Sequence, residues 1–159
     1  MNENPIIKEL EEFSNLRIGN ERQQAYFEQV FKDAKPVKCV PLAEVFTPAE
    51  IGIIKKVLRP KKHQCYRNSA LMIELFPERC KYVEGFGWAS VHRLDHAINR
   101  VGDKYVDVTW ELCLKIDVSS QPYVALIEAS RDEVLADIEA HNNITGNYYL
   151  HNYLKTHEQ

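Results

Sequence analysis

Hydrophobic and polar positions follow a helical spacing through the first sixty residues of the chain. Segments 4–16 and 20–34 each carry an apolar stripe that recurs every three to four residues, which is typical of amphipathic helices. A third helix is marked by its start, where Thr47 precedes Glu50 by three residues as in a capping box. We therefore predict a helical N-terminal part over residues 1–60.

The spacing changes in the next part of the chain, residues 61–129. A further helix is predicted to start near Cys65 and to run to Leu75 or Phe76. After it come short segments rich in aromatic and β-branched residues, most of them separated by turn residues, which predict strands of an antiparallel sheet. These segments are 80–89, 95–101, 104–110 and 122–129.

The C-terminal part, residues 130–159, returns to a helical pattern. Ser130 and Glu133 form a second capping box, and the tail predicts one more helix. Helices followed by strands and then helices predict an α+β fold, with helices packed on an antiparallel β-sheet. A chain of 159 residues fits one domain, so we predict a single domain over 1–159.

Charge and hydropathy narrow the classes of partner. The net charge of −3 gives no electrostatic basis for binding nucleic acid or an anionic membrane. No apolar run is long enough to span a bilayer, and the acidic N-terminus lacks the order of a signal peptide. We expect a cytoplasmic protein with neither nucleic-acid nor membrane partners.

The chain has four cysteines, at positions 39, 65, 80 and 113. A reducing compartment would keep them as free thiols, and no Cys-x-x-Cys pair signals a zinc ribbon or a redox motif. Each is by default a small buried hydrophobic residue. A chemical role for any of them needs partners elsewhere in the chain.

Cys65 has the best candidate surroundings for such a role. It lies at a predicted helix start, where the helix dipole favours a thiolate and free backbone N–H groups can bind an oxyanion. The neighbouring amides of Gln64 and Asn68 could donate further hydrogen bonds.

A histidine and an aspartate could complete a nucleophilic site. With Gly102-Asp103 as a two-residue hairpin turn, Ile98 lies opposite Asp107. His96, two residues from Ile98, then shares a face with Asp107 as its diagonal neighbour, roughly 7–8 Å away between backbones. We predict that Asp107 orients His96 and that His96 acts as the base for Cys65.

The segment 64–111 resembles the transglutaminase-like branch of the papain-like cysteine hydrolases. The likeness lies in a cysteine at a helix start, a "YVEG" strand, His-Ala inside a strand and a "VDVTW" strand, in that order. It implies a papain-like α+β fold with Cys65 as nucleophile, His96 as base and Asp107 as orienting acid. Members are peptidases, amidases and acyl-transferring cross-linkers, so the resemblance implies a peptide, protein or small amide substrate and no cofactor or metal.

Two positions depart from the family pattern. The family often has tryptophan soon after its cysteine and after His-Ala, where this chain has Tyr66 and Ile98. We count Tyr66 among the candidate substrate-binding residues. The segment 86–96 is predicted as a loop or broken strand beside the site, which makes Trp88 another candidate for substrate contact.

Three other interpretations stay open. The fold could be a catalytically inactive module that binds a protein or ligand. His92 and His96 would share a face if their segment were helical and could then bind zinc, although the His-x-x-Asp-His order departs from the inverted zinc-protease motif. A basic run could bind an anionic substrate or partner, although a solvated helix end is the simpler explanation; its members are Lys55, Lys56, Arg59, Lys61 and Lys62.

Overall fold

A five-stranded antiparallel sheet forms the centre of the protein, with strand order β1-β5-β2-β3-β4. The computed structural model describes residues 3–17, 19–142 and 146–157. The strands are β1 (Lys35–Val37), β2 (Cys80–Ala89), β3 (His92–Val101), β4 (Lys104–Val106) and β5 (Tyr123–Ala129). The helices are α1 (Pro5–Asn15), α2 (Glu21–Asp33), α3 (Pro48–Ile53), α4 (Cys65–Leu75), α5 (Arg131–His141) and α6 (Tyr148–His157). Short helical turns complete the chain: η1 (Leu42–Glu44), η2 (Ile54–Leu58), η3 (Thr109–Cys113) and η4 (Val118–Ser120).

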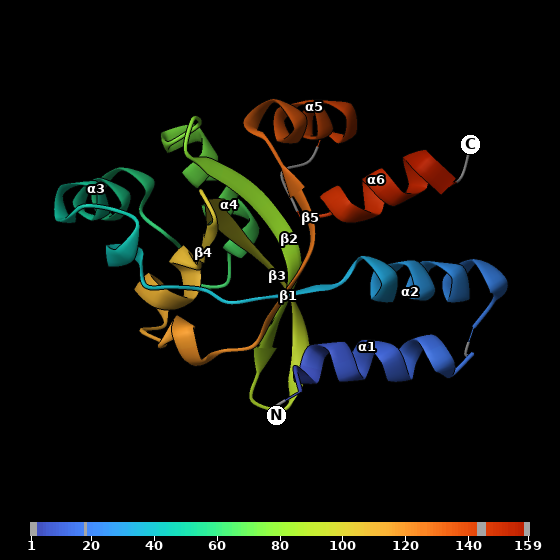
Figure 1. The fold of residues 1–159 in the computed structure, drawn as a ribbon. Coiled ribbons are helices and arrows are strands. Elements are labelled where there is room, and N and C mark those ends of the chain that lie inside the picture. Colours follow the sequence, from blue (N-terminus) through green and yellow to red (C-terminus); the bar gives the residue numbers. More distant parts are fainter. Residues whose placement is uncertain (1–2, 18, 143–145, 158–159) are drawn as a thin grey trace.

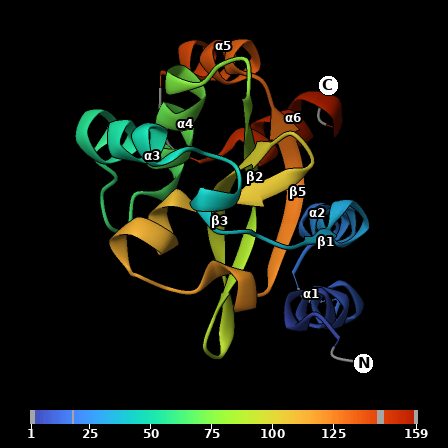
Figure 2. The ribbon, with the colours of Figure 1, turned by 60° about the vertical axis from the view of Figure 1, so that its left-hand side comes forward.

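The long β2–β3 hairpin divides the molecule, as Figure 1 shows. Helices α1, α2 and α6 lie to one side of it, and α3 lies to the other. Turned by 60°, the molecule shows α4 close to α5 at one end of the sheet (Figure 2). The fold is therefore α+β, with helices on an antiparallel sheet as predicted.

The two faces of β2 and β3 serve different parts of the core. Tyr82 and Ala97 belong to the cluster that includes the buried side of α4. Val83 and Ile98, the next residues along the strands, belong to a second cluster with Trp110 on η3. This alternation follows the two-residue period of a strand.

The predicted helix starts are confirmed. Both capping boxes form, with the Thr47 and Ser130 side chains each accepting from the backbone N–H of the glutamate three residues on. The predicted helix at Cys65 is α4, which ends at Leu75. Local sequence is sufficient here because a cap depends only on residues within one turn.

Two strand predictions need correction. Segment 104–110 is a strand only over Lys104–Val106, because Asp107 ends β4 and the chain turns into η3. Segment 86–96 is not a loop but part of a regular hairpin, in which Trp88 pairs with Arg93. The strand ends at Ala89, so the break expected in this segment is only the short turn at 90–91.

Within the described ranges, no helix combines the length and apolarity needed to cross a membrane.

Candidate active site

The β3–β4 hairpin brings the predicted histidine and aspartate together. Asn99 lies opposite Val106, in the register deduced from a two-residue turn, and Gly102 in that turn has a φ of +65° that favours glycine. Asp107 is the first residue beyond β4. Its Oδ2 accepts a hydrogen bond from His96 Nε2 at 2.7 Å, and both side chains are buried.

Two more donors hold the Asp107 carboxylate. The Tyr123 hydroxyl on β5 donates to Oδ2 at 2.8 Å, and the Trp110 backbone N–H donates to Oδ1 at 3.0 Å. With the His96 ring this makes three hydrogen bonds on a carboxylate that water does not reach. Such a carboxylate is satisfied as an anion and fixes which nitrogen of His96 carries the proton.

The plane of the His96 ring is set by Trp110. The two ring centroids lie 4.3 Å apart with an angle of 31° between the planes. The indole also lies against Gly87, where an added Cβ would be only 2.5 Å from Trp110 Cη2. Glycine at this position therefore leaves the space that the indole needs to support the imidazole.

Cys65 is the first residue of α4 and is half-buried. The Cys65 side chain lies close enough to the His96 ring to raise its pKa, and because Asp107 already occupies Nε2, the nitrogen left for the sulfur is Nδ1. The imidazole thus has the thiol on one side and the carboxylate on the other. This is the arrangement that a thiol nucleophile with an oriented base requires.

The charge state of His96 follows from these neighbours. Burial alone would lower the pKa of His96, but the charge and hydrogen bond of Asp107, followed by the contact with Cys65, raise it to about 10. A raised pKa favours the protonated form of the ring at neutral pH.

Helix α4 is tied to the elements that carry His96 and Asp107. The Asn68 amide donates to Thr109 Oγ1 on η3 at 2.9 Å and to the Lys61 carbonyl at 2.8 Å. The Asn99 amide on β3 donates to the Ser69 carbonyl at 2.9 Å. These buried contacts fix the start of α4 relative to the sheet.

The side chain of Asn68 is consequently not available as an oxyanion donor. Both of its amide hydrogens are used in the contacts just described, and the side chain is fully buried. Gln64 is different, because it precedes α4 with an exposed side chain that makes no capping hydrogen bond. Of the two amides predicted for this role, only Gln64 has a side chain that can turn toward a substrate.

The two aromatic candidates for substrate contact lie in different surroundings. Tyr66 is half-buried beside Cys65, and burial and then the nearby Asp95 carboxylate raise the pKa of its hydroxyl. Trp88 lies at the far end of β2 and packs against the cluster that contains Ile6 and Leu10 of α1. Because Trp88 serves the α1 interface, it is not proposed as a substrate contact.

Sequence reasoning missed Tyr123 and Trp110 as supports of the site. A local signal existed for Trp110, since an aspartate three residues before a backbone N–H can cap a helical turn. Tyr123 gave no such signal, because its contact with Asp107 depends on how β5 is placed in the sheet. Cys39 is buried near the same hydroxyl.

The zinc interpretation of His92 and His96 is wrong. Both residues lie on strand β3, where four residues span roughly 13 Å. His92 is exposed at the start of the strand, whereas His96 is buried. The basic run around η2 is exposed at all five positions, and binding of an anionic partner there stays a prediction.

Comparison of the chain with protein-family models, curated proteins and solved structures gave no match.

Proposed function

We propose that the protein is a cysteine-nucleophile hydrolase or acyltransferase that acts on an amide or ester. Cys65 is the nucleophile, His96 the general acid and base, and Asp107 the residue that orients and charges the imidazole. The observation that supports this most directly is the buried 2.7 Å bond between His96 and Asp107 on a ring whose other partner is the Cys65 sulfur. The papain-like fold implied by the resemblance is part of the same proposal.

The reaction follows from where the protons start. The thiol proton resides on His96, and the Cys65 thiolate attacks the carbonyl carbon to give a tetrahedral oxyanion. The imidazolium then gives its proton to the departing amine or alcohol, which leaves a thioester on Cys65. Water or an amine attacks this thioester and gives a proton to His96, and the sulfur departs as thiolate to restore the starting ion pair.

The oxyanion needs donors that do not serve the fold. The first backbone N–H groups of an α-helix have no partner within the helix, and Cys65 is the first residue of α4. We assign the oxyanion to the Cys65 N–H and the side chain of Gln64. Tyr66, at a position where the family that the sequence resembles often has tryptophan, would lie beside the same two donors.

Selective alkylation tests the proposal, and the chain supplies its own control. Cys65 and Cys113 are both half-buried, whereas Cys39 and Cys80 are buried. If exposure alone decides reactivity, Cys65 and Cys113 will react with iodoacetamide at similar rates at pH 6.5. We expect peptide mass spectrometry to find Cys65 labelled at least tenfold faster, because His96 holds it as a thiolate. Equal rates at the two cysteines would contradict the proposal.

Turnover provides the second test. Intact-protein mass spectrometry with a panel of activated esters and amides should detect an acyl adduct that is absent from Cys65→Ala. His96→Gln should lose the adduct while keeping the thiol. Circular dichroism of each variant checks that the fold is retained.

A catalytically silent binding module is the second candidate. A hollow of about 690 Å³ lies between α4 and α5, and its lining includes Gln64 and Tyr66 but not Cys65. A ligand seated there would contact the neighbours of the thiol without reaching it. Fast labelling of Cys65 with no acyl adduct from any substrate of the panel would favour this candidate.

A further inference from the structure

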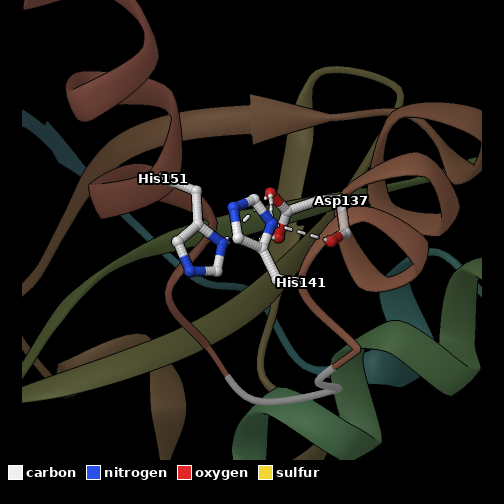
Figure 3. A group of neighbouring side chains, drawn as sticks. All are labelled: Asp137, His141 and His151. Carbon is white, nitrogen blue, oxygen red and sulfur yellow. Dashed lines mark hydrogen bonds and ion pairs between the residues drawn. The ribbon is translucent and has the colours of Figure 1, made fainter. Parts of the chain in front are cut away.

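A second group of histidine and carboxylate side chains joins the two C-terminal helices. Asp137 and His141 lie one turn apart near the end of α5, and His151 lies on α6 (Figure 3). His151 Nδ1 is 3.0 Å from Asp137 Oδ2, and His141 Nδ1 is 3.3 Å from Asp137 Oδ1. One potential ligand atom from each residue lies within 4.8 Å of the other two.

These separations fit a shared metal ion. Two donors bound to zinc at 2.0–2.1 Å with a tetrahedral angle lie roughly 3.3–3.4 Å apart. The two nitrogen–oxygen distances of 3.0 and 3.3 Å are already close to that value. The Asp137 carboxylate therefore already lies at the separation from each imidazole nitrogen that a shared ion would require.

The chemistry of the donors indicates which ion. Two imidazoles and one carboxylate suit zinc and its neighbours among the divalent transition metals, whereas magnesium and calcium prefer oxygen ligands. A hollow of about 670 Å³ lined by all three residues leaves room for water as a fourth ligand.

We propose that Asp137, His141 and His151 bind a zinc ion that links α5 to α6. The site is independent of the Cys65 proposal, because it lies on different elements and uses none of the same residues. The ligand is a divalent transition metal of the zinc class, held by one carboxylate oxygen and two imidazole nitrogens.

Binding requires one rearrangement. The two imidazole rings are stacked, with centroids 3.5 Å apart and only 12° between their planes. An ion must lie near the plane of each ring that binds it, so parallel rings cannot both bind until one tilts. His141 is the ring that moves, because its side chain is 43% exposed whereas that of His151 is 17% exposed.

Zinc titration of the untagged full-length chain tests the site. We expect one equivalent to bind in competition with a chromophoric chelator, with at least tenfold weaker binding in His141→Ala and in His151→Gln. His92→Ala is the matched control, because it removes an exposed histidine from the β2–β3 hairpin and should bind as the wild type does. Zinc should also raise the melting temperature of the wild type more than that of His151→Gln, since the ion joins two helices.

Two controls distinguish binding at this site from binding at Cys65: the Cys65→Ala variant, and cobalt used in place of zinc. We expect Cys65→Ala to bind one equivalent, and the cobalt spectrum to lack a sulfur charge-transfer band. Binding that survives both histidine variants, or that disappears in Cys65→Ala, would overturn the proposal, as would the absence of any binding at micromolar zinc. The His151→Gln variant keeps the test valid if His141→Ala fails to fold.

Discussion

Two histidine–carboxylate clusters of this protein differ in how far water reaches them. The side chains of His96 and Asp107 are 5% and 1% exposed, whereas those of His151 and Asp137 are each 17% exposed. The first pair lies where a strand, a helical turn and the start of α4 meet, with three donors on the carboxylate. The second lies between two helices beside an open hollow.

The difference shows how burial assigns a role to the same pair of groups. A buried imidazole beside a carboxylate has a fixed charge and a fixed orientation, which suits proton transfer to one neighbouring sulfur. A half-buried pair keeps freedom to rotate and can exchange its hydrogen bonds for a metal ion. Four predictions test this contrast, and they are given from the largest expected effect to the smallest.

Asp107→Ala should destabilise the fold most. The change leaves a buried imidazole and the Tyr123 hydroxyl without their acceptor, which costs about 3–5 kcal/mol when one partner of a buried pair is removed. Urea unfolding followed by circular dichroism measures the loss. A loss below 1 kcal/mol would mean that the pair is not buried as described.

The dependence of stability on pH should separate Cys65→Ala from the wild type. In the variant, Asp107 still raises the pKa of His96, so the folded state binds one more proton than the unfolded state above about pH 6.5. Stability is then full below pH 6.5 and falls as pH rises above it, by up to about 2 kcal/mol between pH 6.5 and 8.

The wild type should show a smaller slope over the same interval. If the proton on His96 is the one that Cys65 has given up, folding takes up no net proton until the unfolded thiol itself ionises. Unfolding free energies at pH 6.5, 7.2 and 8 measure both slopes. Equal slopes would contradict the thiolate–imidazolium pair.

Tyr123→Phe should have an intermediate effect. It removes one hydroxyl from Asp107 and leaves the donors from His96 and Trp110 in place. A hydrogen bond to a charged group contributes about 1.5–3 kcal/mol, and we expect the lower end of that range. The same urea titration measures it, and a cost as large as that of Asp107→Ala would show that the hydroxyl, rather than the imidazole, is the main partner of the carboxylate.

Asp137→Ala should have the smallest effect on stability in the absence of metal. Its contacts with His141 and His151 are partly in water, where such pairs contribute within about 1 kcal/mol. Urea unfolding in the presence of a chelator measures what these contacts contribute to the free energy of unfolding without metal. A cost near that of Asp107→Ala would remove the contrast between the two clusters.

The local parts of the fold could be predicted from the sequence. Capping residues such as Thr47 and Ser130 act within one turn, and the pairing of His96 with Asp107 follows from strand period and turn length. Two errors arise where the local pattern has two solutions. The sequence predicts Asp107 within a strand, although it begins a helical turn, and it predicts a loop or broken strand over 86–96, although β2 continues to Ala89.

The remaining contacts depend on tertiary arrangement. Tyr123 reaches Asp107 only because β5 pairs with β2, and His151 reaches Asp137 only because α6 packs on α5. Asn68 was expected to face a substrate, yet it binds Thr109 across 41 positions of sequence. Neither the hydrophobic periodicity nor the spacing of residues along the chain predicts these contacts.

The turn at Gly102 gives the hairpin a strict count. Ten residues, 97–106, separate His96 from Asp107 along the chain, and side chains alternate between the two faces of the sheet along each arm of the hairpin. Replacing exposed Lys104 leaves that count unchanged, whereas deleting a single residue there would point the acid away from the ring. For the chemistry proposed here, the length of this connection therefore matters more than the identity of its exposed residues.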